Sequence, residues 1–415
     1  MPAPEATRPG LTLAVTLLAQ VTGTLCLSVP SVLAPAVAPT LGFAADRVGL
    51  FIGIAYLAAM TSGLMSGRWV ARIGAVGVTQ LALLSFGVGM LGITAGHALG
   101  LVGAALVVGT GYGVLNPSAA SLLNHHSPKT RRGLFFSMKQ AGVPLGVAAA
   151  GLLMPWGLAT IGWRPSLTAL AVVCVAYSIS LLAARRHLEP RTAPATSFAP
   201  DRTPALWRVL KDPGLRRLSI ASFAFAFSQL TFMTFLVSYL NLQLGQSLAL
   251  AAGVLAASQA VSTAARVGWG YAGDRWFDPG MLLGWLGVAA GGSFVALGLL
   301  GWLPGGGTST TASQDAWTVV LSVSAAMACA LTVMGWNGVF FAELARRAAP
   351  GEMATVAGAT QFITFFGSMT GPVIYGEFIR SGLSYSTTYL VLAALPAVAG
   401  VMMLRGSKIA RPRSA

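Results

Sequence analysis

Lys139 and Arg266 are the two cations of this chain that fall inside long apolar stretches rather than at their ends. A charge at the depth of a hydrocarbon layer is costly, and such residues usually mark functional positions. No Asp or Glu occurs in the middle of any apolar stretch, so water or a bound anion must offset these charges. The two residues therefore predict a site for an anion. A guanidinium can donate two parallel hydrogen bonds to a carboxylate, whereas an ammonium acts as a point charge.

Polar and aromatic residues in the same stretches could orient a small molecule beside the two cations. Gln259 and Thr263 precede Arg266 by seven and three residues, so the three share one helical face. Each candidate could equally form a hydrogen bond between helices. The remaining candidate substrate-binding residues are Gln20, Tyr56, Tyr112, Asn116, Gln140, Gln229, Trp336, Asn337 and Gln361.

The apolar stretches are predicted to be membrane spans. The chain has 415 residues, of which 55% are hydrophobic and 9% charged, and this is too apolar for a water-soluble fold. A helix of about 20 apolar residues crosses ~30 Å of hydrocarbon. We therefore expect an all-α integral membrane protein with twelve transmembrane helices. The predicted spans are 11–38, 47–66, 75–96, 99–123, 133–161, 165–184, 216–241, 248–271, 280–302, 316–342, 353–378 and 384–404.

The placement of the basic residues decides what the net charge of +15 means. Most of them lie in alternate loops and at the two ends, and only Arg47, Arg164 and Arg380 lie in the opposite loops. This asymmetry follows the positive-inside rule and predicts a multi-pass protein of the cytoplasmic (inner) membrane with both termini cytoplasmic. This placement of charge argues against nucleic acid as a partner. We also expect the protein to be a monomer.

Enzymatic and metal chemistry are not favoured by the sequence. The three cysteines stand alone in separate spans, and the eleven acidic residues are scattered singly. We therefore expect no metal site, no cofactor and no enzymatic activity.

The chain is predicted to be a tandem duplication. A polar segment, 185–213, separates an N-terminal bundle, 1–184, from a C-terminal bundle, 214–415. The loop after the second span places Arg72 five residues after Gly67, and the loop after the eighth span places Arg275 five residues after Gly270. Gln140 and Gly146 of the fifth span likewise match Gln361 and Gly367 of the eleventh. Such repeats are typical of carriers.

This loop motif resembles that of the major facilitator superfamily, which has the pattern G-x-x-x-D-R-x-G between spans two and three. The second copy has Asp274 between Gly270 and Arg275, but the first has Ala71 at the corresponding position. The resemblance implies two six-helix bundles and a conformational role for the motif residues, with a weaker or differently built latch in the first half. Pro144 and Pro372 would mark paired flexible points that let the halves rock.

A second resemblance concerns the cargo. The segment from Arg266 to Asp274 looks like the eighth span of oxalate and monocarboxylate carriers, in which an Arg four residues before the motif Gly binds the substrate carboxylate. It implies the same role for Arg266 and places the fifth and eighth spans at one central cavity. Gln361 stands where the oxalate carriers have a Lys, which weakens a dicarboxylate assignment.

The expected function is secondary transport of a small organic anion by alternating access. Because no acid lies mid-span, proton symport with the cargo's own carboxylate is the expected coupling. The alternative is a major facilitator exporter of drugs or metabolites.

Overall fold

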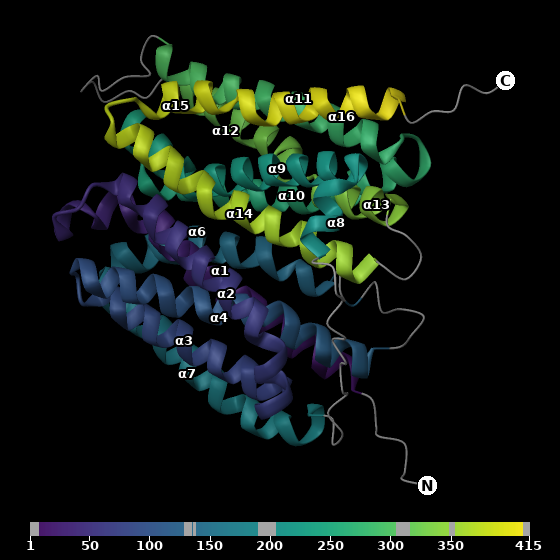
Figure 1. Cartoon of the computed structure of the whole chain (residues 1–415). Helices are drawn as coiled ribbons and strands as arrows, with labels where there is room; N and C mark the ends of the chain where they lie inside the picture. The colour runs from purple at the N-terminus through teal and green to yellow at the C-terminus, as the bar shows by residue number, and fades with distance from the viewer. Residues whose placement is uncertain are drawn as a thin grey trace, which may run out of the picture. The chain divides into compact units, whose positions relative to one another are not determined.

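The computed structural model describes residues 8–127, 135, 138–189, 205–303, 316–347 and 353–409, and within these ranges it contains helices and no strand. The chain divides into two compact units (Figure 1). Unit 1 lies within residues 1–33 and 54–198, and unit 2 within 34–53 and 199–415. The predicted bundles differ from these units mainly in residues 34–53, which belong to unit 2.

The helices of the first half are α1 (Pro9–Val37), α2 (Val48–Ile73), α3 (Ala75–Thr94), α4 (Ala98–His126), α6 (Gly142–Thr160) and α7 (Trp163–Leu188). Those of the second half are α8 (Ala205–Lys211), α9 (Pro213–Ser238), α10 (Leu248–Arg275), α11 (Pro279–Leu299), α12 (Ala316–Thr332), α13 (Asn337–Arg347), α14 (Met353–Arg380), α15 (Tyr385–Leu392) and α16 (Ala394–Ile409). A π-helical turn, Tyr239–Gln243, follows α9.

The described helices account for the predicted spans. Ten helical segments, some made of two consecutive helices, are long and apolar enough to cross a membrane, and the bent helix α2 makes an eleventh. Helix α14, with 28 residues, occupies the place of the remaining predicted span. The expectation of an all-α membrane protein is confirmed. The predicted span 316–342 is not one straight helix, however, because α12 and α13 are separated at residues 333–336.

The segment predicted as a linker begins and ends with helix. Helix α7 continues to Leu188, and α8 (Ala205–Lys211) precedes α9. Asp212 ends this stretch as the N-cap of α9, since its Oδ1 accepts the backbone N–H of Leu215 at 2.7 Å, and Pro213 follows in the first turn. Residues 190–204 of the predicted linker lie outside the described part.

Helix packing in each unit depends on small residues. In unit 1, α3 packs against both α4 and α7 (Figure 1). In unit 2, α9 packs against α14, and a Cβ at Gly371 would lie 2.5 Å from the carbonyl oxygen of Phe227. Gly367 and Gly371, four residues apart, therefore let the backbones of α14 and α9 approach closely.

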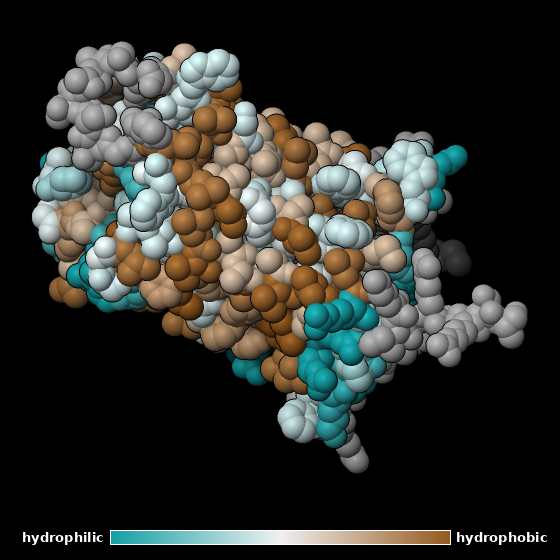
Figure 2. All heavy atoms as spheres, turned by 90° about the horizontal axis from the view of Figure 1, so that it is seen from above, coloured by the Kyte–Doolittle hydropathy of each residue, from teal (hydrophilic) through white to brown (hydrophobic). Residues whose placement is uncertain are grey.

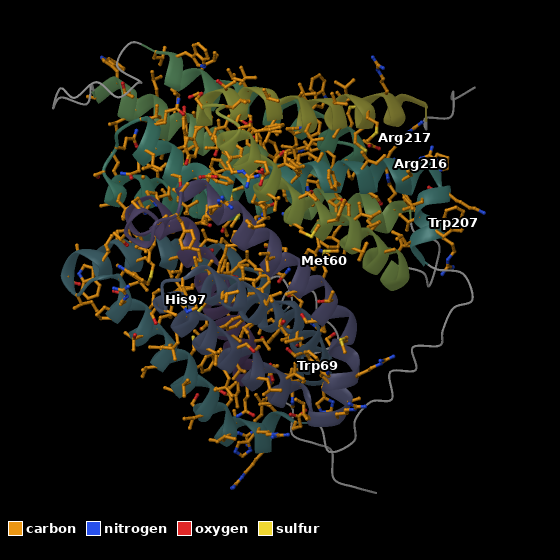
Figure 3. All side chains as sticks on the ribbon, turned by 60° about the vertical axis from the view of Figure 1, so that its left-hand side comes forward. Met60, Trp69, His97, Trp207, Arg216 and Arg217 are labelled. Atoms are coloured by element: carbon orange, nitrogen blue, oxygen red, sulfur yellow. The ribbon has the colours of Figure 1, made fainter. Side chains whose placement is uncertain are left out.

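The outer surface is apolar between helix ends. Figure 2 shows one face on which hydrophobic side chains occupy the middle, while hydrophilic residues gather toward the margins. Trp285 and Val398, for example, are 59% and 66% exposed. Polar and basic side chains mark the ends of the helices, as Arg216 and Arg217 do at the start of α9 (Figure 3). This distribution suits contact with lipid.

Candidate functional site

In unit 1 the polar side chains gather around Lys139. This residue precedes α6 within the span Met138–Thr160 and is only 2% exposed. Its Nζ donates to the side-chain oxygens of Gln20 at 2.6 Å, of Gln140 at 3.3 Å, and of Asn116. The acceptors come from α1, from α4 and from the neighbouring residue, so the ammonium ties three parts of unit 1 together.

Two glycines bring α6 close enough to α1 for this contact. A Cβ at Gly142 would lie 2.8 Å from the Cβ of Gln20, and one at Gly146 would lie 2.5 Å from the carbonyl oxygen of Val21. A larger residue at either position would push the helices apart. Pro144, predicted as a flexible point, lies in the first turn of α6, where a missing N–H costs no helical hydrogen bond.

The Lys139 group extends to two tyrosines. Gln20 Nε2 donates to Thr24 Oγ1 at 3.1 Å and reaches the Tyr112 hydroxyl at 3.5 Å. The Tyr112 ring meets Tyr56 edge to face at 6.2 Å between centroids. The structure therefore joins six of the predicted site residues in one group: Gln20, Tyr56, Tyr112, Asn116, Lys139 and Gln140.

The Lys139 group satisfies the hydrogens of the ammonium without neutralising its charge. All three acceptors are neutral amide oxygens, and among the described residues no carboxylate forms an ion pair with Lys139. A buried charge held only by dipoles retains a strong preference for a nearby anion.

In unit 2 the site forms around Arg266 on α10. Its Nε donates to the carbonyl oxygen of Met334 at 3.1 Å, in the break between α12 and α13. Gln259 lies on the same face of α10, 4.0 Å from the Met334 sulfur, and Thr263 donates to the Gln259 carbonyl at 2.8 Å. The face of α10 that was predicted to carry Gln259, Thr263 and Arg266 therefore contacts the break between α12 and α13.

The other side of the break meets α9. Trp336 is buried, its Nε1 donates to Gln229 Oε1 at 2.9 Å, and its ring stacks on Phe225 with centroids 5.3 Å apart. Two buried polar atoms of this region, Gln259 Oε1 and Asn337 Nδ2, have no hydrogen-bond partner in the described part of the chain. Such atoms usually bind water or a ligand.

Gln361 is not joined to this group. It lies on α14, which is attached to α9 through the hydrogen bond from Thr364 Oγ1 to Ser222 Oγ at 3.0 Å. Among the described contacts, none links Gln361 to Arg266. Its predicted role therefore gains no support from the geometry of unit 2.

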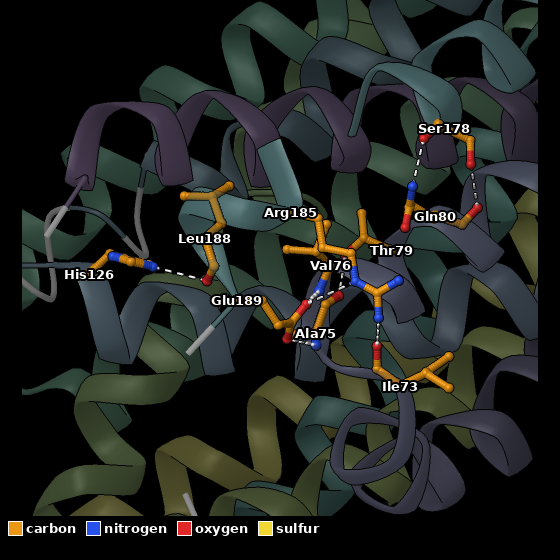
Figure 4. A network of polar contacts seen from close by, with 10 residues as sticks. All are labelled: Ile73, Ala75, Val76, Thr79, Gln80, His126, Ser178, Arg185, Leu188 and Glu189. Carbon is orange, nitrogen blue, oxygen red and sulfur yellow. Dashed lines mark hydrogen bonds and ion pairs between the residues drawn. The ribbon is translucent and has the colours of Figure 1, made fainter. Parts of the chain in front are cut away.

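The loop after α2 is latched by residues that the sequence did not single out (Figure 4). Gly74 has φ of 82°, and the next two backbone N–H groups, those of Ala75 and Val76, donate to the carboxylate of Glu189 at 2.7 and 3.1 Å. Arg185 Nη2 donates to the Ile73 carbonyl at 2.7 Å. The N-terminus of α3 thus takes its capping acid from the end of α7.

In unit 2, the helix that follows the second copy of the loop motif, α11, is capped by the residue just before it. Asp278 Oδ1 accepts the Met281 N–H at 3.0 Å at the start of α11, and Asp278 also pairs with Arg346 of α13. Burial raises the pKa of Asp278, but the hydrogen bonds from Arg346 and from the Met281 backbone outweigh it, so this pKa lies below its usual value. Glu343 of α13 pairs with Arg346 at 2.8 Å and with Arg347 at 2.5 Å.

The predicted motif residues lie close in sequence to the two capped helix starts, those of α3 and α11. Arg72 and Arg275 are exposed at the ends of α2 and α10, Gly67 and Gly270 lie one turn earlier, and Pro372 lies inside α14. The side chain of Asp274 is outside the described part. In the first half, where Ala71 stands in place of the family's acid, Glu189 supplies a carboxylate to the N-terminus of α3.

We expect Glu189→Ala to lower the stability of unit 1. The substitution removes the acceptor of two N–H groups and a negative charge from a helix N-terminus, which together are worth ~1 kcal/mol. The apparent melting temperature of purified protein in detergent should therefore fall. Glu377→Ala is the matched control, because Glu377 pairs with Arg380 while about half exposed and should contribute little. Equal melting temperatures for the two variants would contradict the capping role.

Comparisons with known proteins agree with this architecture. The family model of the Major Facilitator Superfamily matches residues 16–372. The 4-hydroxybenzoate transporter PcaK of Acinetobacter baylyi is 28% identical over 133 residues, which cover 32% of this chain and 29% of that transporter. The matched part is therefore less than a third of the relative's length.

Several solved structures share the fold. A bacterial homologue of the human lysosomal transporter Spinster superposes with a TM-score of 0.76 at 16% identity, covering 98% of this chain and 99% of that one. A mutant of the nucleoside transporter NupG gives 0.75 at 14% identity, with coverages of 95% and 99%. A mutant of the peptide transporter POT gives 0.74 at 15% identity, with coverages of 96% and 94%. At these identities the likeness concerns the fold alone.

Proposed function

This chain belongs to the major facilitator superfamily, and we propose that it carries a small organic anion, a monocarboxylate, across the cytoplasmic membrane by alternating access. It is a multi-pass membrane transporter and not an enzyme. The observation that carries the proposal is the position of Arg266, a cation within a span whose guanidinium meets an unwound backbone segment. Unwound backbone at membrane depth is tolerated where it is buried in protein or lines a cavity.

The chemistry around Arg266 suits one carboxylate with a polar group beside it. The guanidinium offers donors in a planar fork, and the two partnerless atoms, Gln259 Oε1 and Asn337 Nδ2, could accept from and donate to a second group of the substrate. Phe225 and Trp336 supply an aromatic surface on the side of the break that faces α9. The partial relative transports 4-hydroxybenzoate, which has a carboxylate, a ring and a hydroxyl.

Lys139 is proposed as a second positive charge for anion binding. Carriers of this family are built from duplicated bundles, and in the proposal unit 1 offers the ammonium and unit 2 the guanidinium to the substrate. The three amide acceptors of Lys139 hold the ammonium in place while leaving its charge for the substrate. Each bundle thus contributes one cation to anion binding.

Coupling to a proton is proposed to use Lys139 together with the carboxylate of the substrate. The sequence has no acid in the middle of a span, and the buried Glu343 is already paired with Arg346 and Arg347 near the end of α13. Lys139 is a titratable group at depth, and its amide partners can turn to offer either an oxygen or an NH2 group, so they could hold both the charged and the neutral amine.

The orientation in the membrane is proposed from the basic helix ends. Both termini would lie in the cytoplasm with the loops after α2, α7 and α10, because positively charged loops are retained on that side. We propose a monomeric carrier, since each chain contains both bundles.

A thermal-shift screen on purified protein tests the substrate class. Aromatic and aliphatic monocarboxylates, oxalate, and neutral nucleosides are compared, since a ligand that binds only the folded carrier raises its melting temperature. We expect at least one monocarboxylate to raise the melting temperature of the carrier and nucleosides to leave it unchanged. In proteoliposomes, uptake of that compound should respond to an imposed pH gradient. Stabilisation by neutral compounds alone would overturn the proposal.

A further inference from the structure

The tenth span contains a built-in break. Helix α12 ends at Thr332, α13 begins at Asn337, and the two form one apolar span of Ala316–Leu344. The end of a helix leaves carbonyl groups without intrahelical partners, and hydrocarbon offers none. The break must therefore be supported by side chains from neighbouring helices.

Two side chains of α10 supply that support. Trp269 Nε1 donates to the carbonyl oxygen of Leu331 at 2.8 Å, and Arg266 Nε donates to that of Met334 at 3.1 Å. Residues three apart on a helix project on the same side. One face of α10 therefore holds the break at two points, one on each side of Val333.

The backbone of the break lies directly on α10. A Cβ at Gly335 would lie 2.6 Å from the Leu331 oxygen and 2.7 Å from Cδ1 of Trp269. A Cβ at Gly338, in the first turn of α13, would lie 3.2 Å from the carbonyl oxygen of Arg266. A side chain at Gly335 would therefore force a neighbour to move, and one at Gly338 would be tightly packed.

Movement at the break would reach the charged end of α13. This helix has eleven residues, so it is ~16 Å long. Its far end carries Glu343, Arg346 and Arg347, and Arg346 reaches Asp278 at the start of α11. A tilt of α13 about the break would therefore strain or release this ion-pair cluster.

We propose that Trp269 is a positioning residue for transport, and that the bond from Arg266 to Met334 is a latch opened by the carboxylate of the substrate. This inference rests on the proposed function. A carboxylate binds a guanidinium more strongly than a neutral carbonyl does, because it carries the opposite charge and can accept two parallel hydrogen bonds. Substrate binding draws Arg266 from Met334, and the bond from Trp269 to Leu331 remains as the pivot on which α13 tilts.

The test uses a cysteine reporter on α13 in the full-length carrier. Ala342→Cys places a thiol on this helix, while the native Cys26, Cys174 and Cys329 are buried. The rate of alkylation is measured with and without the monocarboxylate that gives the largest thermal shift. We expect the ligand to change the rate several-fold.

Trp269→Phe removes the pivot bond while keeping an aromatic ring. We expect the ligand to change the alkylation rate less in this variant, because the pivot is lost, and the KM for uptake to rise roughly fivefold, the effect of losing one neutral hydrogen bond. The matched control is Trp285→Phe on α11, whose ring is 59% exposed. It should behave as the unsubstituted carrier does.

The outcomes separate this inference from the proposed function. A carboxylate that stabilises the protein but leaves the alkylation rate unchanged would overturn the latch and leave the proposed function standing. The same alkylation rates and KM in Trp269→Phe and Trp285→Phe would overturn the positioning role. If no carboxylate stabilises the protein, the proposed function fails, and the latch fails with it.

Discussion

Arg266→Ala is expected to abolish carboxylate binding at concentrations that saturate the unsubstituted carrier. Removing one member of a buried, hydrogen-bonded charge pair costs ~2–5 kcal/mol, so the dissociation constant should rise at least roughly 30-fold. The substitution also removes the donor to Met334, so some loss of stability should accompany it. The melting temperature without ligand measures the loss of stability, and the ligand-induced thermal shift measures the loss of binding.

Two further variants show whether the loss is specific. Arg266→Lys keeps the charge but loses the planar fork, so weak binding should remain. Arg216→Ala removes an exposed arginine at the start of α9 in the same unit and should leave affinity unchanged (Figure 3). Full affinity in Arg266→Ala would refute the assigned role.

Lys139→Gln is expected to stop accumulation of the substrate while leaving the protein as stable or more stable. A buried charge held by neutral dipoles is costly, and replacing it by a neutral polar group removes that cost. The same substitution removes the proposed proton carrier, so a pH gradient should no longer drive uptake. Gradient-driven uptake is therefore expected to be lost while the melting temperature stays the same or rises.

Lys139→Arg separates charge from proton transfer. An arginine stays protonated, so exchange of internal for external substrate should persist while accumulation against a gradient is lost. Both variants are compared with Lys211→Gln, an exposed lysine on α8 outside the spans. Gradient-driven accumulation by Lys139→Arg at the unsubstituted level would remove Lys139 from the coupling mechanism.

The sequence predicted much of unit 1 because its site follows from residue type. Charged and polar residues are costly in lipid, so a lysine and several amides in apolar spans were expected to meet, as Lys139, Gln20 and Asn116 do. Gly142 and Gly146, spaced four apart, allow the close helix contact with α1 on which this group depends.

The break in the tenth span was not predicted. Residues 333–336 lie within a continuous apolar run, and neither a proline nor a charge marks the interruption. Trp269 was overlooked for a related reason, since a tryptophan near the end of a span usually lies at the membrane interface. Its partner is a backbone carbonyl of another helix, and backbone partners leave no pattern in the sequence.

The cap of α3 was not predicted. Ala71 showed that the family's usual acid was missing, but Glu189, whose carboxylate caps α3, lies 118 positions later at the start of the predicted linker. Which distant carboxylate reaches a helix N-terminus depends on the packing of α3 against α7.

The most direct test of the account compares a carboxylate with its own primary amide. Calorimetric titration of the purified carrier with the tightest monocarboxylate from the screen, and with the amide of the same compound, changes the charge while keeping the shape. If Arg266 recognises a carboxylate, the acid should bind at least roughly 30-fold more tightly, a difference of ~2 kcal/mol. Equal affinity for acid and amide would contradict the central claim that this carrier selects anions.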